Sequence, residues 1–501
     1  MEDSRPRQMA LDGGIAVLDI GSNSVRMVIY DGYARVPFPL FNEKFACGLG
    51  RGLANTGKLS PEGVELAKKA LTRFCKMARF LGVARTDLLA TAAMREAEDG
   101  PDFAKWIENL FETKVTILSG DDEARLAAHG VLCGVPDADG IVGDLGGGSM
   151  DLVALEHGRF GNYETLPLGH LRLQEAAEGN MEKVAAYVEG HLEKLTWLSG
   201  ARSRNFYIVG GAWRSIARVF MFRAMYPLSV IDNYTVPKDK AIRLLNGIIK
   251  ASPEELSAIP TVAKRRIPSL PLVSLVMRRI IEIAEPAHLV FSGYSMREGQ
   301  FLKSLPEELR YEDPLLAACS RLVEQRGRFE AHGHEMFEWM TPLFPVENKD
   351  ERRLRLATCL LSDISWFEHP DFRAAHAFQR VLHLPFAGLT HRDRAMLAFA
   401  IAFRYDGEPK FFQDTGIQEL VDDEGLRRAR VLGAALRLAN TLSHGVSDLL
   451  QKTTMTFDGG ELELTLPDDG ILFSSEPVQR RVQALVKALD GSKGTVIGGT
   501  A

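Results

Sequence analysis

The sequence of 501 residues contains few cysteines, and this scarcity limits the class of protein it encodes. The five cysteines are widely spaced and include no CxxC pair, which argues against a disulfide framework or a structural zinc site and fits a reducing compartment. The first residues are charged and lack the apolar core of a signal peptide, and no apolar run reaches the length of a membrane span. We therefore expect a cytoplasmic protein without a membrane partner.

An excess of positive charge is also missing. The formal net charge is −6, and hydrophobic and charged residues make up 46% and 25% of the chain, as in an ordinary globular protein. This balance gives no indication of a nucleic-acid partner. The chain is too long for a single hydrophobic core, and its length predicts roughly three domains.

A glycine-rich stretch at residues 141–153 is the most informative part of the sequence. Apolar residues lead into Asp144, three consecutive glycines follow, and apolar residues resume after Asp151. This pattern predicts two strands joined by a glycine turn, whose backbone N–H groups can approach a phosphate closely. The two carboxylates suit a metal, a water or a hydroxyl beside that phosphate. A plain glycine hairpin fits the same pattern.

Residues 19–28 repeat this pattern, with Asp19 standing 125 residues before Asp144. The interval is far longer than the period of a solenoid repeat. A duplicated α/β unit with one phosphate turn in each half explains both the spacing and the pattern, although chance similarity of two short turns is the alternative. Two facing phosphate turns predict a ligand held in a cleft between two lobes.

Two charged residues between these motifs are candidates for the same site. Residues 88–97 read as a buried strand ending in Arg95, which is either an ion-pair partner or a phosphate ligand. The helix predicted to begin after Ser119 carries acids in its first turn, where Asp121 and Asp122 suit the helix dipole. This junction precedes the second glycine motif by only ~20 residues, so we expect Glu123 to lie near it.

The second half contains another strand that runs into Gly210 and Gly211 and then into a helix. The helix N-terminus can receive an anion, or the glycines serve close packing only. A charged, proline-flanked joint at residues 306–314 marks a domain boundary. Beyond it the sequence predicts a β-hairpin at 452–466 and helices at 315–325, 329–340, 352–366, 372–382, 392–404 and 425–443.

Together these motifs resemble the exopolyphosphatase/guanosine pentaphosphate phosphatase family of the sugar kinase/actin/heat-shock-chaperone superfamily. The resemblance lies in residues 19–24, 90–95, 119–125, 144–149, 209–211 and 292–299. It implies an α/β fold with duplicated actin-like (ribonuclease H-like) lobes around an interlobe cleft, followed by a mostly helical HD-like domain. The implied domains are lobe I at 1–127, lobe II at 128–305, the helical domain at 306–450 and a small β/α segment at 451–501.

The resemblance also implies an activity, namely hydrolysis of the terminal phosphoanhydride of inorganic polyphosphate with release of orthophosphate. Hydrolysis of guanosine pentaphosphate is the alternative, and a nucleotide-binding kinase or actin-like protein is an alternative of another class. Glu123 matches the family's catalytic glutamate, which activates the attacking water, and Asp144 and Asp151 are further catalytic acids. Asp151 stands where many relatives have Glu.

A Mg²⁺ cofactor is implied as well, with Asp19, Asp144 and Asp151 as the residues beside the metal, and a homodimer is expected. The substrate-binding residues implied by the resemblance come from both turns and from the neighbouring motifs. They are Ser22, Asn23, Ser24, Arg95, Gly146, Gly147, Gly148, Ser149, Gly210 and Gly211.

The carboxyl-terminal part is expected to lack a second active site. Ser362 and Asp363 stand where an HD phosphohydrolase would have its His-Asp pair of metal ligands. The scattered histidines His332, His334, His369 and His376 read as packed or surface residues. Arginine clusters at 352–355, 427–430 and 480–481 are either solvated helix faces or part of a groove for a long polyanion.

Overall fold

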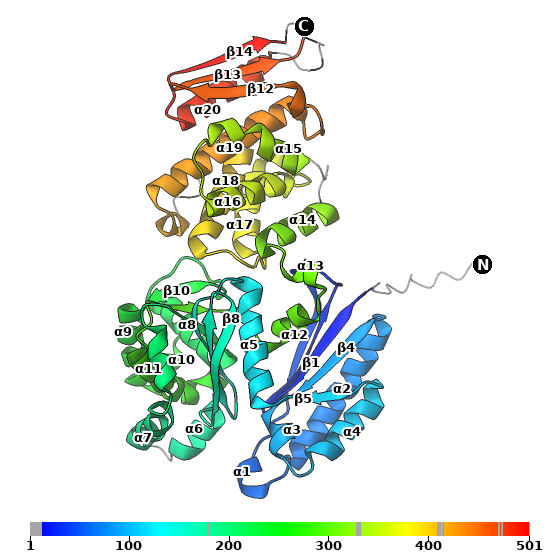
Figure 1. Ribbon diagram of the computed structural model, residues 1–501, viewed down its shortest axis with the longest axis vertical. Helices are drawn as coiled ribbons and strands as arrows, with labels where there is room; N and C mark the ends of the chain where they lie inside the picture. The colour runs from blue at the N-terminus through cyan, green and yellow to red at the C-terminus, as the bar shows by residue number, and fades with distance from the viewer. Residues whose placement is uncertain are drawn as a thin grey trace, which may run out of the picture. The chain divides into compact units, whose positions relative to one another are not determined.

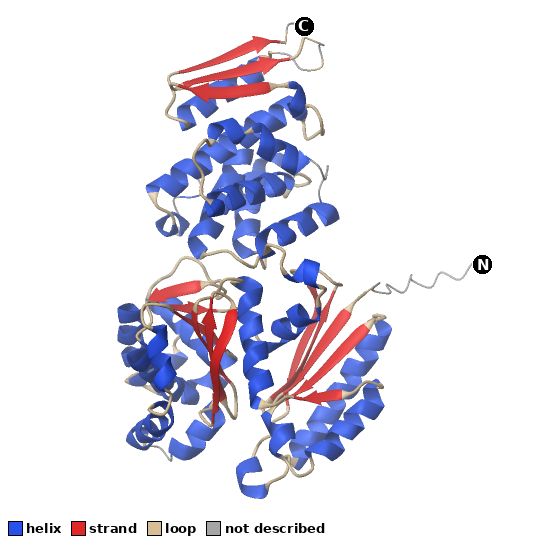
Figure 2. Cartoon of the chain, in the orientation of Figure 1, coloured by secondary structure: helices blue, strands red, loops and turns tan. Residues whose placement is uncertain are grey.

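The structure is a computed structural model of the chain, and it describes residues 13–177, 180–326, 332–407, 412, 415–468, 471 and 474–499. The chain forms two compact units, residues 1–312 and 313–501 (Figure 1). The first unit contains two α/β lobes, and the second is mostly helical (Figure 2). This architecture confirms the predicted fold, whereas the predicted domain limits stay predictions. None of the helices in the described ranges is long and apolar enough to cross a membrane.

Lobe I is built on a five-stranded sheet in the order β3-β2-β1-β4-β5. Its strands are β1 (Ile15–Ile20), β2 (Ser24–Tyr30), β3 (Pro39–Ala46), β4 (Arg85–Ala90) and β5 (Val115–Ile117). Its helices are α1 (Leu53–Thr56), α2 (Pro61–Phe80), α3 (Ala92–Glu96), α4 (Gly100–Phe111) and α5 (Gly120–Gly134). Helix α2 begins as predicted, with Ser60 as the N-cap and Pro61 at the first helical position. Its buried residues, among them Phe74, pack with α4 against one face of the sheet.

Lobe II contains a six-stranded sheet in the order β10-β11-β9-β6-β7-β8. The strands are β6 (Gly140–Leu145), β7 (Met150–Glu156), β8 (Arg159–Leu166), β9 (Asn205–Val209), β10 (Tyr234–Pro237) and β11 (His288–Phe291). The helices are α6 (His170–Ala177), α7 (Met181–Leu192), α8 (Gly211–Arg223), α9 (Lys238–Ile249), α10 (Pro253–Ser257), α11 (Leu270–Ala284), α12 (Met296–Ser304) and α13 (Glu307–Arg310). In both lobes an antiparallel hairpin (β1–β2, β6–β7) lies beside a parallel strand (β4, β9), which confirms the predicted duplication.

Helix α5 lies between the two sheets and packs on both of them. Leu126 and Cys133 belong to the core against lobe I, together with residues of α12. Ala124, Ala128 and Val131 belong to the core against lobe II. Because one helix fills both interfaces, the N-terminal turn of α5 is held in a fixed place relative to both lobes.

Helices α5 and α12 cross at Gly130 and Gly299 with their backbones in direct contact. A β-carbon on Gly299 would lie 1.9 Å from the carbonyl oxygen of Leu126, and one on Gly130 would lie 2.3 Å from that of Ser295. Neither position has room for a side chain, because the obstructing atoms are backbone. The two glycines therefore set the distance between the helices that join the lobes.

The second unit packs its helices around α18, which is buried along nearly its whole length. Its helices are α14 (Pro314–Arg326), α15 (His332–Trp339), α16 (Lys349–Leu360), α17 (Arg373–His383), α18 (His391–Tyr405), α19 (Asp423–Ser443) and α20 (Glu476–Ala488). Strands β12 (Thr454–Asp458) and β13 (Glu461–Leu466) form the predicted hairpin, and β14 (Lys493–Gly498) pairs with β13 in parallel. Part of the helix predicted at 329–340 lies outside the described residues, because α15 follows a gap at 327–331.

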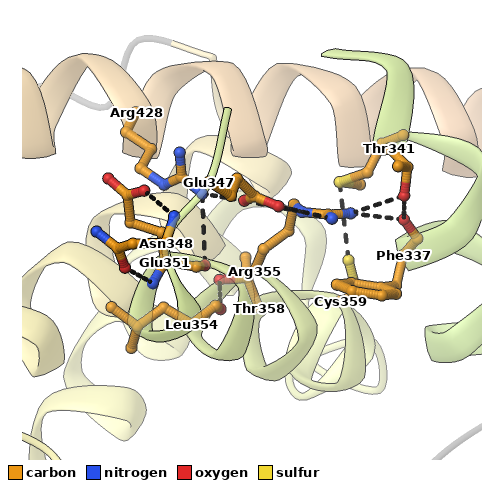
Figure 3. A network of polar contacts seen from close by, with 11 residues as sticks. Phe337, Thr341, Glu347, Asn348, Glu351, Leu354, Arg355, Thr358, Cys359 and Arg428 are labelled. Atoms are coloured by element: carbon orange, nitrogen blue, oxygen red, sulfur yellow. Dashed lines mark hydrogen bonds and ion pairs between the residues drawn. The ribbon is translucent and has the colours of Figure 1, made fainter. Parts of the chain in front are cut away.

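A buried ion network joins α16 to α19 (Figure 3). Arg355 is fully buried, and its Nη2 donates to Glu347 at 2.8 Å while its Nη1 donates to the Phe337 carbonyl at 2.6 Å. Arg428 pairs with the same carboxylate. One glutamate thus pairs with two arginines from separate helices. Arg355 and Arg428, which belong to the arginine clusters at 352–355 and 427–430, therefore serve the internal packing of the unit.

The histidines of the second unit and Asp363 can be compared with their predicted roles. His332 is buried and contacts Glu335 through Nδ1 at 3.1 Å, whereas His334, His369 and His376 are exposed, as predicted. Asp363 forms an ion pair with Arg404 at 2.9 Å. A guanidinium therefore neutralises the carboxylate at the position where the resemblance places a metal ligand.

Substitution of Gly299 by Ala is expected to destabilise the protein by about 1–3 kcal/mol, because the new methyl group overlaps a helix backbone. Urea unfolding followed by circular dichroism measures this loss. Gly190 in α7 is the matched control, since a β-carbon there meets nothing within 4 Å. Gly190→Ala should be neutral or stabilising by up to ~1 kcal/mol. Equal effects of the two substitutions would contradict the helix crossing.

Substitution of Glu347 by Gln is expected to destabilise the protein by about 3–5 kcal/mol, because it leaves Arg355 and Arg428 without a counter-charge in a buried place. The same unfolding measurement tests this. Glu424→Gln breaks an exposed pair with Arg427 one helical turn away, and should change stability by only about 0.5 kcal/mol. A small effect at both sites would show that the buried network contributes little.

Candidate active site

The two glycine turns face each other across a cleft of about 200 Å³ between the lobes. A β-carbon on Gly147 would lie 3.8 Å from the β-carbon of Ser22, so the turns nearly touch. Most of the predicted site residues line this cleft, namely Asp19, Ser22, Asn23, Ser24, Glu123, Asp144, Gly146, Gly147, Gly148, Ser149, Gly210 and Gly211. Arg95 and Asp151 are not among the lining residues and lie beside Glu123.

Both turns have the same hydrogen bonding, which leaves their tips with free donors. Gly21 N–H donates to the Ser24 carbonyl at 3.0 Å, and Gly146 N–H donates to the Ser149 carbonyl at 2.9 Å. At the tip of each turn, the backbone carbonyls accept hydrogen bonds from N–H groups of neighbouring segments; the carbonyls are those of Ser22, Asn23, Gly146 and Gly147. The backbone N–H groups at the tips have no acceptor within the described ranges; they are those of Ser22, Asn23, Gly147 and Gly148. Such exposed N–H groups form a nest for an anion.

Glu123 enters the cleft from the first turn of α5. Ser119 caps this helix in a capping box with Asp122, which fixes the turn that carries Glu123. Burial raises the pKa of Glu123 to about 7; Arg95 opposes this shift, and the charges of Asp144 and Asp19 add to it. The buried Oε2 atom of Glu123 accepts no hydrogen bond from any described residue. A carboxylate with this pKa can accept a proton from water near neutral pH.

Asp144 and Asp151 stand opposite each other in the β6–β7 hairpin, so their side chains share one face of the sheet. Burial raises the pKa of Asp144 to about 6, and burial together with the charge of Glu123 raises the pKa of Asp151 well above its usual range. Asp151 accepts a hydrogen bond from Thr165 Oγ1 at 2.7 Å. The hairpin therefore places one acid in the cleft wall and the other behind it.

Arg95 lies on helix α3 and not at the end of a strand, which corrects the secondary structure predicted for residues 88–97. Strand β4 ends at Ala90, and the following residues 92–94 are buried in the helix. The prediction was wrong because the apolar pattern of buried alanines and a methionine fits either a strand or a helix. The intrinsic propensity of these residues favours the helix. Arg95 Nη1 donates to the Leu118 carbonyl at 2.7 Å and lies 3.5 Å from Glu123 Oε2. It contacts the candidate base.

Five basic side chains that the sequence reasoning missed also line the cleft: Arg26, Lys44, Arg214, Arg266 and Arg297. Arg297 pairs with Asp19 at 3.0 Å. Arg26 and Lys44 are opposite residues of the β2–β3 pair, so both project from one face of that sheet edge. Burial, together with the charge of the neighbouring Arg266, lowers the pKa of Lys44 to about 8. Of these, only Arg297 stood in a motif that the resemblance had singled out.

Cations and carboxylates both surround the cleft. The charged groups that act most strongly on Glu123 are Arg95 and two aspartates, of which Asp144 acts more strongly. Around Lys44, Arg266 acts most strongly, followed by Asp19 and then by Arg26 and Arg297. Asp19 therefore acts on both Glu123 and Lys44. The cleft presents basic side chains from both lobes to an elongated anion.

The cleft has a limited set of carboxylate ligands for Mg²⁺. Among the described residues, no group of three or more His, Cys, Asp or Glu side chains is placed to hold a metal ion. Mg²⁺ bound together with phosphates needs only one or two carboxylates, and waters fill the other positions. Asp144 and Asp19, which also pairs with Arg297, line the cleft and can supply these carboxylates. Asp151 is not among the lining residues and accepts a hydrogen bond from Thr165.

Comparison with known proteins places the chain in a family. Residues 28–308 match the sequence model of the Ppx/GppA phosphatase family, and residues 315–497 match that of the exopolyphosphatase C-terminal domain. Because the first match covers more than half of the chain, the protein belongs to the Ppx/GppA phosphatase family. The predicted resemblance is thereby confirmed.

The relatives carry different names. Retrograde regulation protein 2 of Saccharomyces cerevisiae is 25% identical over 460 residues, covering 82% of this chain and 76% of that protein. The guanosine-5'-triphosphate,3'-diphosphate pyrophosphatase of Aeromonas hydrophila is 22% identical over 479 residues, covering 92% and 95%. Exopolyphosphatase 2 of Mycobacterium tuberculosis is 30% identical over 172 residues, covering 32% and 54%. Membership of the family thus leaves the substrate undecided among relatives.

Solved structures share the fold over more than half of the chain. An exopolyphosphatase from Cytophaga hutchinsonii matches with a TM-score of 0.53 at 21% identity, covering 58% of this chain and 99% of that one. The PPX-GPPA enzyme of Aquifex aeolicus matches with a TM-score of 0.51 at 22% identity, covering 58% and 99%. These similarities establish the two-lobed fold.

The raised pKa of Glu123 predicts a pH-dependent stability difference. The folded protein holds this proton up to about pH 7, whereas an unperturbed glutamate loses it at 4.5, so folding stability falls as the pH rises between these values. Glu123→Gln should therefore be more stable than wild type at pH 8 by about 1–3 kcal/mol, since one pKa unit corresponds to about 1.4 kcal/mol. The gain should vanish near pH 4.5.

Urea unfolding at several pH values measures this difference. Asp121→Asn is the control, because Asp121 lies in the same helical turn but pairs with Arg125 at the surface. That variant should show no gain at pH 8. A Glu123→Gln protein that is less stable than wild type at pH 8 would contradict the strained, buried state of Glu123.

Proposed function

We propose that the protein is an exopolyphosphatase, which hydrolyses the terminal phosphoanhydride of inorganic polyphosphate and releases orthophosphate. The observation that supports this most directly is that five basic side chains line the same cleft as Glu123 and the two glycine turns. A chain of phosphates needs cations along its length and a water-activating group only at its terminus. The cleft offers both kinds of group, because Arg26, Lys44, Arg214, Arg266 and Arg297 line it together with Glu123.

In this reaction the terminal phosphate lies between the two glycine turns. Their free N–H groups bind its non-bridging oxygens, which carry the charge in the loose transition state of phosphoryl transfer. Glu123 orients the attacking water and takes its proton, and Arg95 at 3.5 Å keeps the carboxylate in place. Catalysis then consists mainly of positioning and charge neutralisation, which a cleft of fixed geometry supplies.

A Mg²⁺ ion fits this proposal beside Asp19 and Asp144. When bound, it would neutralise charge on the phosphates. Asp151 would act indirectly, because its bond to Thr165 and its charge beside Glu123 influence the protonation of that base. Arg297 is already paired with Asp19, and it would help to set the position of that carboxylate.

Guanosine pentaphosphate is the second candidate substrate. The similarity to the Aeromonas hydrophila pyrophosphatase, which extends over 92% of this chain, favours it. Both substrates present a terminal phosphoanhydride to Glu123, and they differ in the group that would lie against the basic side chains of the cleft. Orthophosphate release from long-chain polyphosphate and from guanosine pentaphosphate, compared as kcat/KM, decides between them.

Glu123→Gln is expected to lower kcat on the preferred substrate by about 10²- to 10⁴-fold, because a positioned general base contributes this much. The wild-type rate should fall about tenfold per pH unit below the pKa of Glu123, which is about 7, since the protonated carboxyl cannot accept the water proton. Orthophosphate release measured from about pH 5 to 9 tests both effects.

Asp121→Asn is again the matched control and should keep its activity, because Asp121 is bonded to Arg125. If Glu123→Gln retained full activity on both substrates, the mechanism would be wrong. If the wild type released orthophosphate only from guanosine pentaphosphate, the mechanism would stand and the proposed substrate would be wrong.

A further inference from the structure

His170 lies in the cleft wall between the second glycine turn and Arg266. It is the first residue of α6 and is 8% exposed. Its Nδ1 atom lies 2.8 Å from the carbonyl oxygen of Gly146, and its Nε2 atom lies 3.3 Å from Nη1 of Arg266. This one ring therefore contacts both the turn that faces the terminal phosphate and a cation that lines the cleft.

The two partners fix the state of the imidazole. A carbonyl oxygen can only accept a hydrogen bond, so Nδ1 of His170 must carry the proton. A guanidinium can only donate, so Nε2 must offer its lone pair to Arg266. The ring is therefore neutral and held in one tautomer.

The turn itself is a rigid support for this ring. Leu171 N–H donates to the Gly147 carbonyl at 2.9 Å, and a β-carbon on Gly169 would lie 2.3 Å from the backbone of Gly148. The start of α6 is thus packed directly on the turn. His170 is therefore held at a fixed place relative to the N–H groups of the turn.

Arg266 and Lys44 come from different lobes. Arg266 belongs to the 3₁₀ helix η2 (Lys264–Ser269) of lobe II, and Lys44 belongs to β3 of lobe I. Neither forms an ion pair with a carboxylate in the part of the chain that the structure describes. Both line the cleft, and Arg266 is the charged group that acts most strongly on Lys44. Two unpaired cations facing one cleft form a place for an anion.

We propose that His170 is a positioning residue, which holds the guanidinium of Arg266 beside Lys44 so that the pair binds a phosphate group other than the one released. This rests on the proposed function, because it assumes a substrate with several linked phosphates. The terminal phosphate is bound by the glycine turns and does not need Arg266. His170 therefore raises the affinity for phosphate chains and has no part in the chemical step.

The test compares two ligands, inorganic tripolyphosphate and orthophosphate. Binding is measured by calorimetry in the Glu123→Gln protein to prevent turnover. We expect His170→Phe and Arg266→Met each to weaken tripolyphosphate binding about tenfold and to leave orthophosphate binding within about twofold, as for the loss of one charge-assisted hydrogen bond. The double variant should bind tripolyphosphate no more weakly than Arg266→Met alone, because both changes remove one interaction.

Two further variants separate positioning from a structural effect. His170→Gln should restore most of the affinity, since its carboxamide can donate to Gly146 and accept from Arg266. His191→Phe is the matched control, because His191 makes the same Nδ1 contact with a carbonyl, that of Tyr187, at 2.9 Å in α7. That variant should bind both ligands as the parent protein does.

Additive losses in the double variant, or equal losses for both ligands, would overturn the positioning role. Failure of the proposed function would look different. In that case the wild type would release no orthophosphate from polyphosphate, whatever the binding data showed. If the wild type hydrolysed polyphosphate but His170→Phe bound tripolyphosphate as tightly as the parent protein, only the role of His170 would be rejected.

Discussion

The contact between the backbones of α5 and α12 at Gly130 and Gly299 is the constraint on which the site depends. Helix α5 carries Glu123 at its start, and α12 carries Arg297, which pairs with Asp19 of the first glycine turn. Both helices are packed between the lobes, and side chains at the crossing would push them apart. The crossing therefore sets the distance from the base to the phosphate-binding turn.

The same packing explains why the acids of the site are held in an unfavourable state. Glu123 is largely surrounded by protein, so few waters can solvate its charge, and its pKa rises. The pKa values of Asp144 and Asp151 are raised for the same reason, since the strands that carry them are central in the lobe II sheet. The fold gives up stability at this point, and such losses are common at sites that must hold a reactive group.

The parts of the site that the sequence predicted share a local signature. A glycine turn after an aspartate is visible in a short window, so both hairpins and their duplication were predictable, as was the helix start at Ser119. Arg95 was placed on the wrong element because hydrophobicity alone does not separate a buried strand from a short buried helix. Its neighbour Glu123 is 28 residues away in the sequence, so their contact is a property of the assembled lobe.

The cations of the cleft had no such signature. Lys44 and Arg26 face each other only because β2 and β3 pair in one register, and Arg266 comes from a short 3₁₀ helix between larger elements. An isolated arginine or lysine in a sequence is most often a solvated surface residue. Only the tertiary structure shows that these residues, far apart in the chain, converge on one cleft.

Three arginines of the cleft are held in three different ways, and the difference matters for the binding of anions. Arg297 is paired with a carboxylate, Arg214 donates to the carbonyls of Ser292 and Tyr294, and Arg266 contacts a neutral imidazole. A carboxylate cancels the charge of a guanidinium and competes with phosphate for it. A neutral acceptor fixes the direction of the guanidinium and leaves its full charge for the ligand. Histidine as one fixed tautomer is thus better suited than an acid to hold a phosphate-binding arginine.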